Sequence, residues 1–197
     1  MARILYLNPR HRVYCLCVEK TRQSCQEGPL SNLQLSTIHL IDGARVSTLP
    51  GLIALTPPKK CARGRDNDQL IALVHLTGQS NITGDAMQGW LLKKSAFFYS
   101  TPGSVVTAMR LMAESINNEL FDRNLKKGFE GSRVNGSLCM LVIRKETAYC
   151  LVIGDAKIYL LAERDAIEIV DRENPSDGLG ISQVLNRAFS QHTVKDG

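Results

Sequence analysis

The sequence predicts an α+β fold in which two β-sheets pack face to face and are covered by helices. Short apolar runs separated by turn-like residues occupy the first third of the chain, a long stretch with helical periodicity follows, and strand-like runs return after it. Of the 197 residues, 44% are hydrophobic and 22% are charged, which is sufficient for one substantial core. We expect both helices on one outer face of the sandwich.

The first third reads as β-structure. Apolar runs at residues 4–7 and 13–18 flank a turn-like sequence that contains Pro9, and this arrangement predicts a hairpin. Further strands are predicted at the following ranges: 33–40, 46–49, 52–55 and, as a buried strand, 69–76.

Two helices are predicted in the middle of the chain, at 87–99 and 104–127. Ser104 is the expected N-cap of the second helix, and Gly128 ends it. The apolar stripe of this helix is spaced by three or four residues, as core packing requires: Val105, Met109, Met112, Ile116 and Leu120. Its polar residues are expected to face water: Asn117, Asn118, Glu119 and Arg123.

Strand-like runs return after the second helix and are joined by short turns. They cover residues 137–144, 147–153, 157–163 and 166–170. Their order predicts an antiparallel meander.

Composition excludes several classes of function. The net charge of +5 comes from scattered Lys and Arg residues without interleaved aromatics, so we expect no nucleic-acid partner. No run of about 18 apolar residues and no signal peptide can be read, so we expect no membrane partner and a cytoplasmic protein. The six cysteines lack zinc-ligand spacing, and Cys139 and Cys150 are predicted to be reduced, buried residues.

The densest group of positive charge is Lys59, Lys60, Arg63 and Arg65. From charge alone this group is either an anion site or a solvated loop, and the sequence leaves both interpretations open.

Three motifs resemble the metal-dependent (PPM-type) serine/threonine protein phosphatases. The sequence Asn135-Gly136-Ser137-Leu138, followed by a strand pair and then by Gly154-Asp155-Ala156-Lys157, is similar to the central hairpin of that family. Upstream, residues 63–68 resemble the family's Arg-x-x-Asn-x-Asp motif, although Asp66 stands in place of the Asn. The resemblance implies that Arg63, reinforced by Arg65, binds phosphate, and that Asp68 and Asp155 are metal ligands.

The chain also departs from the family pattern. The strand after Asp68 runs into His75-Leu76-Thr77-Gly78-Gln79, where the family has an Asp that bridges two metal ions, and a neutral His75 is a poor substitute. The sequence Ser176-Asp177-Gly178-Leu179 superficially resembles a later Asp-Gly motif, but we interpret it as a loop because no apolar strand precedes it. Asp155 is explained equally well by turn chemistry.

Three hypotheses for function follow. The favoured one is a catalytically degenerate PPM-type phosphatase-like domain with a binding, regulatory or scaffolding role in signalling, for which no cofactor is expected. The alternative is an active metal-dependent protein phosphatase that uses Mg²⁺ or Mn²⁺ and whose C-terminal ligands are missing from this chain. The third is a small β-rich binding module with a basic loop. The expected partner is a protein or phosphoprotein, and the oligomeric state stays open.

The resemblance also suggests a domain division. It covers about residues 52–180, so we predict a β-rich N-terminal extension at 1–48 that packs on a phosphatase-like domain at 49–197. The C-terminal part of that domain is expected to be missing.

Overall fold

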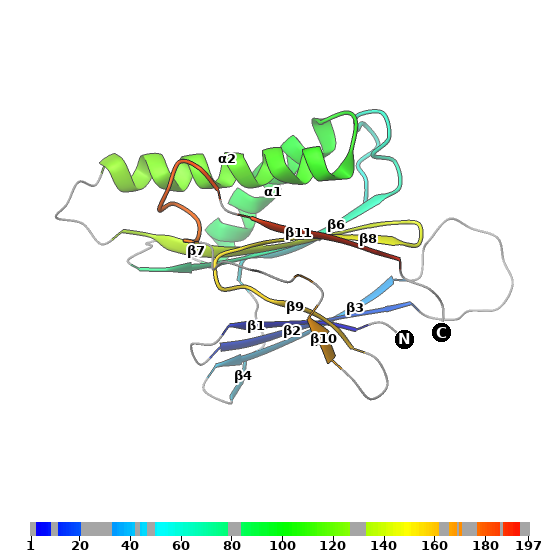
Figure 1. Cartoon of the computed structure of the whole chain (residues 1–197), viewed down its shortest axis with the longest axis horizontal. Helices are drawn as coiled ribbons and strands as arrows, with labels where there is room; N and C mark the ends of the chain where they lie inside the picture. Colours follow the sequence, from blue (N-terminus) through cyan, green and yellow to red (C-terminus); the bar gives the residue numbers. More distant parts are fainter. Residues whose placement is uncertain are drawn as a thin grey trace, which may run out of the picture.

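The computed structural model of the chain has three layers: two β-sheets and a pair of helices on the outer face of one sheet (Figure 1). It describes residues 3–8, 12–20, 33–41, 44–46, 50–78, 84–126, 133–161, 166–168, 170, 177–185 and 187–193. The predicted α+β sandwich, with both helices on one outer face, is confirmed.

The first sheet is antiparallel and has the strand order β10-β9-β1-β2-β3-β4. Its strands are β1 (Arg3–Asn8), β2 (Arg12–Lys20), β3 (Leu33–Ile41), β4 (Ala44–Val46), β9 (Ile158–Leu161) and β10 (Ala166–Glu168). The predicted hairpin at the start of the chain is confirmed, with Tyr6 opposite Tyr14. Because β1 pairs with β9, hydrogen bonds join the predicted N-terminal extension to the later part of the chain. The division into two domains stays a prediction.

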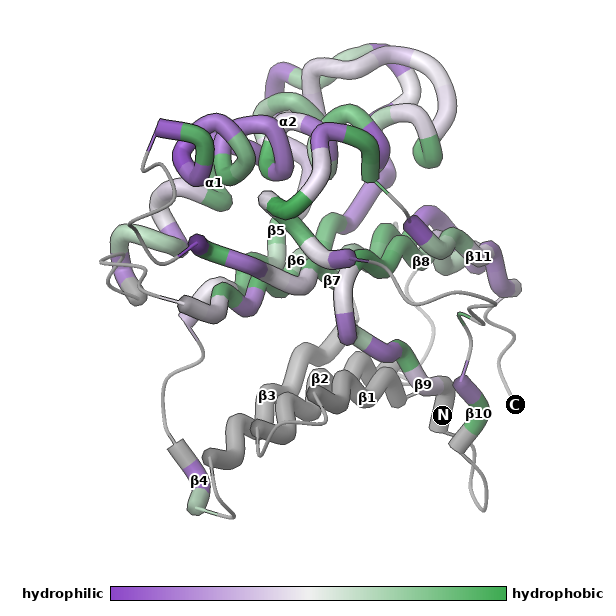
Figure 2. The backbone as a smooth tube through the Cα atoms, turned by 60° about the vertical axis from the view of Figure 1, so that its left-hand side comes forward, coloured by the Kyte–Doolittle hydropathy of each residue, from purple (hydrophilic) through white to green (hydrophobic). Residues whose placement is uncertain are grey.

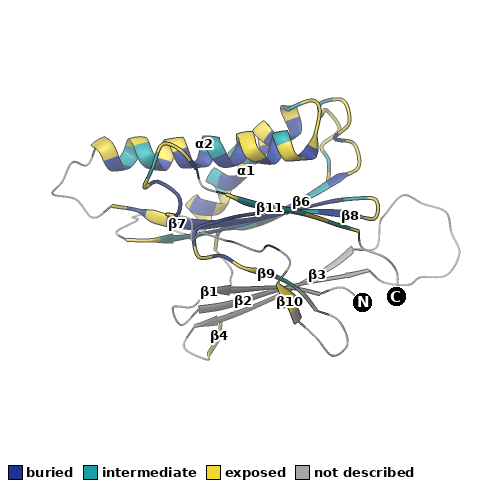
Figure 3. Ribbon diagram, viewed as in Figure 1, coloured by how far each residue is buried: buried dark blue, intermediate teal, exposed yellow. Residues whose placement is uncertain are grey.

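The second sheet carries the core of the molecule and has the order β11-β8-β7-β6-β5. Its strands are β5 (Leu52–Leu55), β6 (Asp68–Thr77), β7 (Asn135–Arg144), β8 (Thr147–Ile153) and β11 (Ala188–Thr193). Successive residues of β6 point to opposite faces, so that Leu70 and Ala72 contact the helices while Ile71 and Leu73 lie in the other core cluster. Since both faces are covered, the central strands are almost continuously hydrophobic and buried (Figures 2 and 3).

The helices α1 (Gly84–Ser100) and α2 (Val105–Lys126) lie on this second sheet. The predicted N-cap is confirmed, because the Thr107 amide donates to Ser104 Oγ at 3.0 Å. The apolar stripe of α2 is buried as predicted. The prediction for Asn117 was wrong: this side chain is fully buried, since it bonds to two backbone groups of residues 180–182.

The predicted meander is wrong at one position. Strand β8 does not pair with β9, because the chain leaves the second sheet at Gly154, which has a φ of 74°, and enters the first sheet. Ile158 is then buried between the sheets. The sequence also missed β11, an edge strand that pairs with β8 and whose few apolar residues give no strong pattern.

Within the part of the chain that the structure describes, neither helix combines the length and the hydropathy needed to cross a membrane.

Candidate functional site

The residues that the sequence singled out lie at two opposite ends of the second sheet. Asp68 is the first residue of β6 and pairs with Arg144, whereas Thr77 is its last residue and pairs with Asn135. Asp155 follows β8 at the Asn135 end. A strand rises about 3.4 Å per residue, so the two ends of this ten-residue strand are roughly 30 Å apart. Asp68 and Asp155 therefore cannot share one metal ion.

Asp68 forms a buried ion cluster with two arginines. Its Oδ2 accepts hydrogen bonds from Arg65 Nη1 at 2.5 Å and from Arg144 Nη2 at 2.8 Å, and its Oδ1 accepts one from Arg144 Nε at 2.5 Å. Asp68 and Arg65 are both 0% exposed. The hydrogen bonds to Asp68 raise the pKa of Arg144 above its usual value. Both carboxylate oxygens of Asp68 therefore accept hydrogen bonds from guanidinium groups.

The Arg65 guanidinium joins the loop before β6 to the connection between the helices. Its Nε donates to the Thr101 carbonyl at 3.0 Å, and its Nη2 donates to the carbonyls of Gly103 at 2.6 Å and Ser104 at 2.5 Å. Its Cζ lies 5.2 Å from the centre of the Phe98 ring. The predicted role of Arg65 in phosphate binding stays a prediction, but four hydrogen bonds already use its donors within the protein.

Tyr99 adds a second connection at the same place. Its hydroxyl donates to the backbone carbonyls of Leu55 at 3.1 Å and Asp68 at 3.0 Å, and burial raises its pKa. In contrast, the remaining basic residues of this region, Lys59, Lys60 and Arg63, are exposed. The end of the sheet around Asp68 therefore has a buried ionic centre and a cationic surface.

At the other end of the sheet, the phosphatase-like motifs meet in what we call the loop cluster, residues 135–137, 154–155 and 177–180. The Gly136 amide donates to the Leu179 carbonyl at 3.2 Å, and the Leu179 amide donates back to Gly136 at 2.7 Å. The Asp155 amide donates to Ser137 Oγ at 3.2 Å. Three motifs that are far apart in the sequence are thus hydrogen-bonded neighbours.

Glycines make this close approach possible. A Cβ atom on Gly154 or on Gly178 would lie 2.9 Å from the same carbonyl oxygen, that of Gly136, so neither position has room for a side chain. Both glycines also have positive φ angles, 74° and 87°. Asp155 and Asp177, which are both exposed, are the sequence neighbours of these two glycines.

Asp177 was predicted to lie in an ordinary loop. The segment is a loop, but an isolated β-bridge between Gly136 and Leu179 fixes it against the central hairpin. The sequence did not indicate this position because no apolar run directly precedes Asp177, and a bridge of one residue pair requires no strand pattern.

Two buried asparagines of α2 form hydrogen bonds with the backbone of the loop cluster and of the residues beside it. Asn124 Nδ2 donates to the carbonyls of Val134 and Gly180, each at 2.8 Å, and its Oδ1 accepts from the Val134 amide at 2.9 Å. Asn117 donates to the Ser182 carbonyl and accepts from the Gly180 amide. These contacts replace the secondary-structure hydrogen bonds that the loop backbone lacks.

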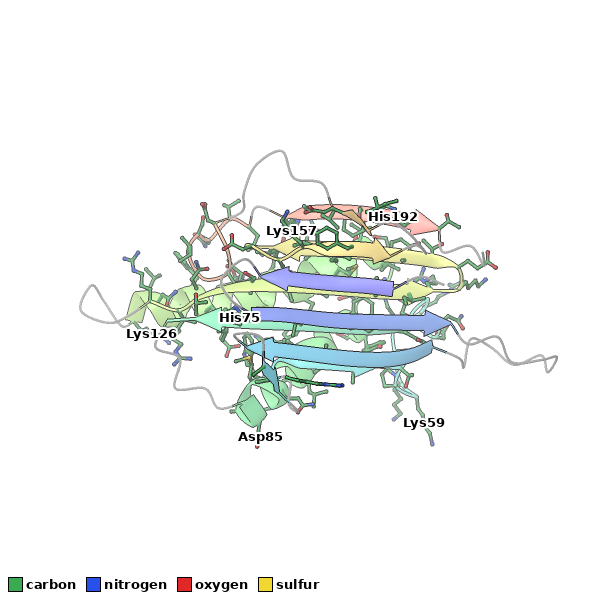
Figure 4. All side chains as sticks on the ribbon, turned by 90° about the horizontal axis from the view of Figure 1, so that it is seen from below. Lys59, His75, Asp85, Lys126, Lys157 and His192 are labelled. Carbon is green, nitrogen blue, oxygen red and sulfur yellow. The ribbon has the colours of Figure 1, made fainter. Side chains whose placement is uncertain are left out.

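The end of β6 provides no carboxylate to this cluster. Thr77 is the last residue of the strand, and its hydroxyl donates to the Asn135 carbonyl at 3.2 Å. His75 is half-buried two residues earlier. Figure 4 shows His75 near this end of the molecule and Lys59 at the opposite end.

The described residues do not fit a pair of divalent metal ions. Among them, no three His, Cys, Asp or Glu side chains come together. Asp155 and Asp177 are the two carboxylates of the loop cluster, whereas hard divalent ions take six or more oxygen ligands and a pair of such ions needs several shared carboxylates.

Comparison with known proteins identifies the fold. No family model matches the chain, and no curated protein matches it. Several solved structures are similar at low sequence identity, and three of them are described below. The serine/threonine phosphatase of S. agalactiae matches with a TM-score of 0.57 and 10% identity over 94% of this chain and 76% of that chain. Stp1 from Staphylococcus aureus, also a serine/threonine phosphatase, matches with a TM-score of 0.52 and 10% identity over 73% of this chain and 70% of that chain.

The third structure is PppA of Pseudomonas aeruginosa, described as a key regulatory component of T6SS. It matches with a TM-score of 0.50 and 14% identity over 100% of this chain and 76% of that chain. At these identities the likeness concerns the fold alone. At that level, the resemblance predicted from the sequence is confirmed.

Proposed function

Because the chain has the fold of PPM-type serine/threonine phosphatases, we propose that it is a phosphatase-like binding domain without metal-dependent hydrolysis. One observation carries the proposal: both carboxylate oxygens of the buried Asp68 accept hydrogen bonds from Arg65 and Arg144. This ion cluster lies at the end of β6 remote from the loop cluster. A carboxylate held in this way is a structural anion and is not available to a metal ion.

The chemistry of hydrolysis supports the same proposal. Two-metal catalysis requires several carboxylates around both ions, so that one water is activated and the leaving oxygen is stabilised. The loop cluster offers Asp155 and Asp177, and the end of β6 offers a threonine hydroxyl that is bonded to Asn135. These two carboxylates and one hydroxyl are too few to balance the four positive charges of two divalent metal ions.

We further propose that the domain has a regulatory or scaffolding role with a protein or phosphoprotein partner. PppA, a similar fold, is described as a regulatory component. A cytoplasmic location belongs to the proposal, because Cys61, Cys139 and Cys150 are free thiols, as is usual in a reducing compartment.

A second function, metal-dependent phosphatase activity with Mg²⁺ or Mn²⁺, has one observation in its favour. Asp155 and Asp177 are both exposed, and each adjoins a glycine that packs against the Gly136 carbonyl. Two carboxylates placed in this way supply part of the ligand set that a divalent metal ion requires.

Hydrolysis of p-nitrophenyl phosphate, measured in about 2 mM MnCl₂ and in about 10 mM MgCl₂, separates the two functions. We expect no turnover above that of buffer, and no heat of Mn²⁺ binding by calorimetry. Metal-dependent turnover that is lost in Asp155→Asn and in Asp177→Asn, but kept in Asp122→Asn on the exposed face of α2, would overturn the binding-domain proposal.

A further inference from the structure

Three basic residues in the loop at residues 57–65 have no ion-pair partner within the described structure. Lys59, Lys60 and Arg63 are all exposed, and none of them forms a described ion pair. We call these three residues the cationic loop. Their mutual repulsion opposes folding, and no described ion pair offsets it.

The backbone beneath these charges is fixed. The Ala62 amide donates to the Tyr99 carbonyl at 2.8 Å, the Arg65 amide donates to the Ala62 carbonyl at 3.0 Å, and Gly64 O accepts from Arg144 Nη2 at 2.6 Å. The buried Arg65–Asp68–Arg144 cluster then anchors the end of the loop. A rigid backbone lowers the entropy lost when a partner binds.

Neighbouring groups leave the surface positive. Asp66, which follows the loop, is an exposed carboxylate, while Asp68 is neutralised by Arg65 and Arg144. At the β7–β8 turn, which follows Arg144, the exposed Lys145 and Glu146 offset each other. The three cations of the cationic loop therefore exceed the free negative charge around them.

We propose that the cationic loop is a docking surface for an acidic, Asp- and Glu-rich segment of a protein partner. Its charges are distributed along a stretch of chain and face outwards, with Lys59 extending from the end of the molecule that lies away from His75 (Figure 4). Successive carboxylates of an extended acidic segment match such an arrangement, which increases the association rate and the specificity for the segment.

Nucleic acid fits this surface less well. Proteins that bind single strands interleave aromatic side chains with basic ones, whereas residues 57–65 contain no aromatic residue. The docking surface does not depend on whether the loop cluster at the far end of the sheet hydrolyses phosphate, since the two are separated by the length of β6.

The test measures the fluorescence anisotropy of a labelled twelve-residue peptide of Asp, Glu and Ser, with an Asn, Gln and Ser peptide of equal length as its neutral counterpart. The full chain is compared with the variant Lys59→Gln/Lys60→Gln/Arg63→Gln. A matched variant, Lys93→Gln/Arg110→Gln/Lys126→Gln, removes three exposed cations from the helices instead. Because only surface residues change, urea unfolding of all three proteins is expected to coincide to within about 1 kcal/mol.

We expect the acidic peptide to bind with a Kd that rises about tenfold in the loop variant and less than about threefold in the helix variant. The Kd should also rise steeply when NaCl increases from about 50 to 500 mM, because exposed charges are screened. Equal weakening in both variants, or no binding of the acidic peptide, would overturn the proposal. Tighter binding of an oligothymidylate that depends on the cationic loop would overturn it too, and would assign the surface to nucleic acid.

Discussion

Asp68→Asn tests whether the buried carboxylate is structural. The substitution keeps the shape of the side chain but leaves two guanidinium groups, one of them fully buried, without their counter-charge. Removing one partner of a buried ion pair costs about 3–5 kcal/mol, because the remaining charge stays desolvated. For a domain of this size each kcal/mol lowers the Tm by about 2–4 °C, so we expect a decrease of roughly 6–20 °C.

Urea unfolding followed by circular dichroism measures this loss. Asp66→Asn is the matched control, since Asp66 is exposed and lies two residues away. Its expected effect is below about 0.5 kcal/mol. A result in which both variants lose equal stability would refute the structural role of Asp68. The same conclusion would follow if Mn²⁺ stabilised the parent chain and this gain disappeared in Asp68→Asn, because Asp68 would then be a metal ligand.

Three further predictions concern the core and the loop cluster. Asn124→Ala removes three buried hydrogen bonds and should cost about 2–4 kcal/mol in urea unfolding, whereas Asn118→Ala on the exposed face should cost less than about 1 kcal/mol. Gly178→Ala should destabilise by more than Gly64→Ala, since both have positive φ but only the Cβ at 178 would meet neighbouring oxygens; equal losses would contradict this explanation. Burial raises the pKa of Cys150 to about 12, so iodoacetamide at pH 8 should leave it unlabelled in mass spectra until urea unfolds the chain.

Much of the fold could be predicted because its elements carry regular periods. Helix α2 combines an N-cap at Ser104 with a stripe of apolar residues, and β6 is a continuous apolar run because helices cover one face and the other sheet covers the opposite face. Strand β11 could not be predicted in this way. It lies at a sheet edge, where half of its residues are exposed and few of them are apolar.

The candidate site was harder to predict because its contacts connect residues that are remote in sequence. Arg65 and Asp68 are three residues apart, and that spacing alone fits a phosphate-binding motif as well as an ion pair. The partner that distinguishes them, Arg144, lies 76 positions after Asp68 and is brought opposite it only by the register of β6 and β7. The motif at residues 63–68 therefore contains two members of this ion cluster but does not indicate the third, and the predicted roles in phosphate and metal binding stay predictions.

Hydrogen bonds within the protein connect the loops of the loop cluster. In a site organised by metal, the ligands and the ions hold one another in place, and loss of ligands would release the loops. Here the loops are fixed by backbone pairs between Gly136 and Leu179 and by the amides of Asn117 and Asn124 from α2. Asparagine amides both donate and accept, so they satisfy backbone groups at either end of the turn. These hydrogen bonds use backbone and asparagine groups and no carboxylate, so we expect Asp155→Asn and Asp177→Asn to change the stability of the loop cluster little.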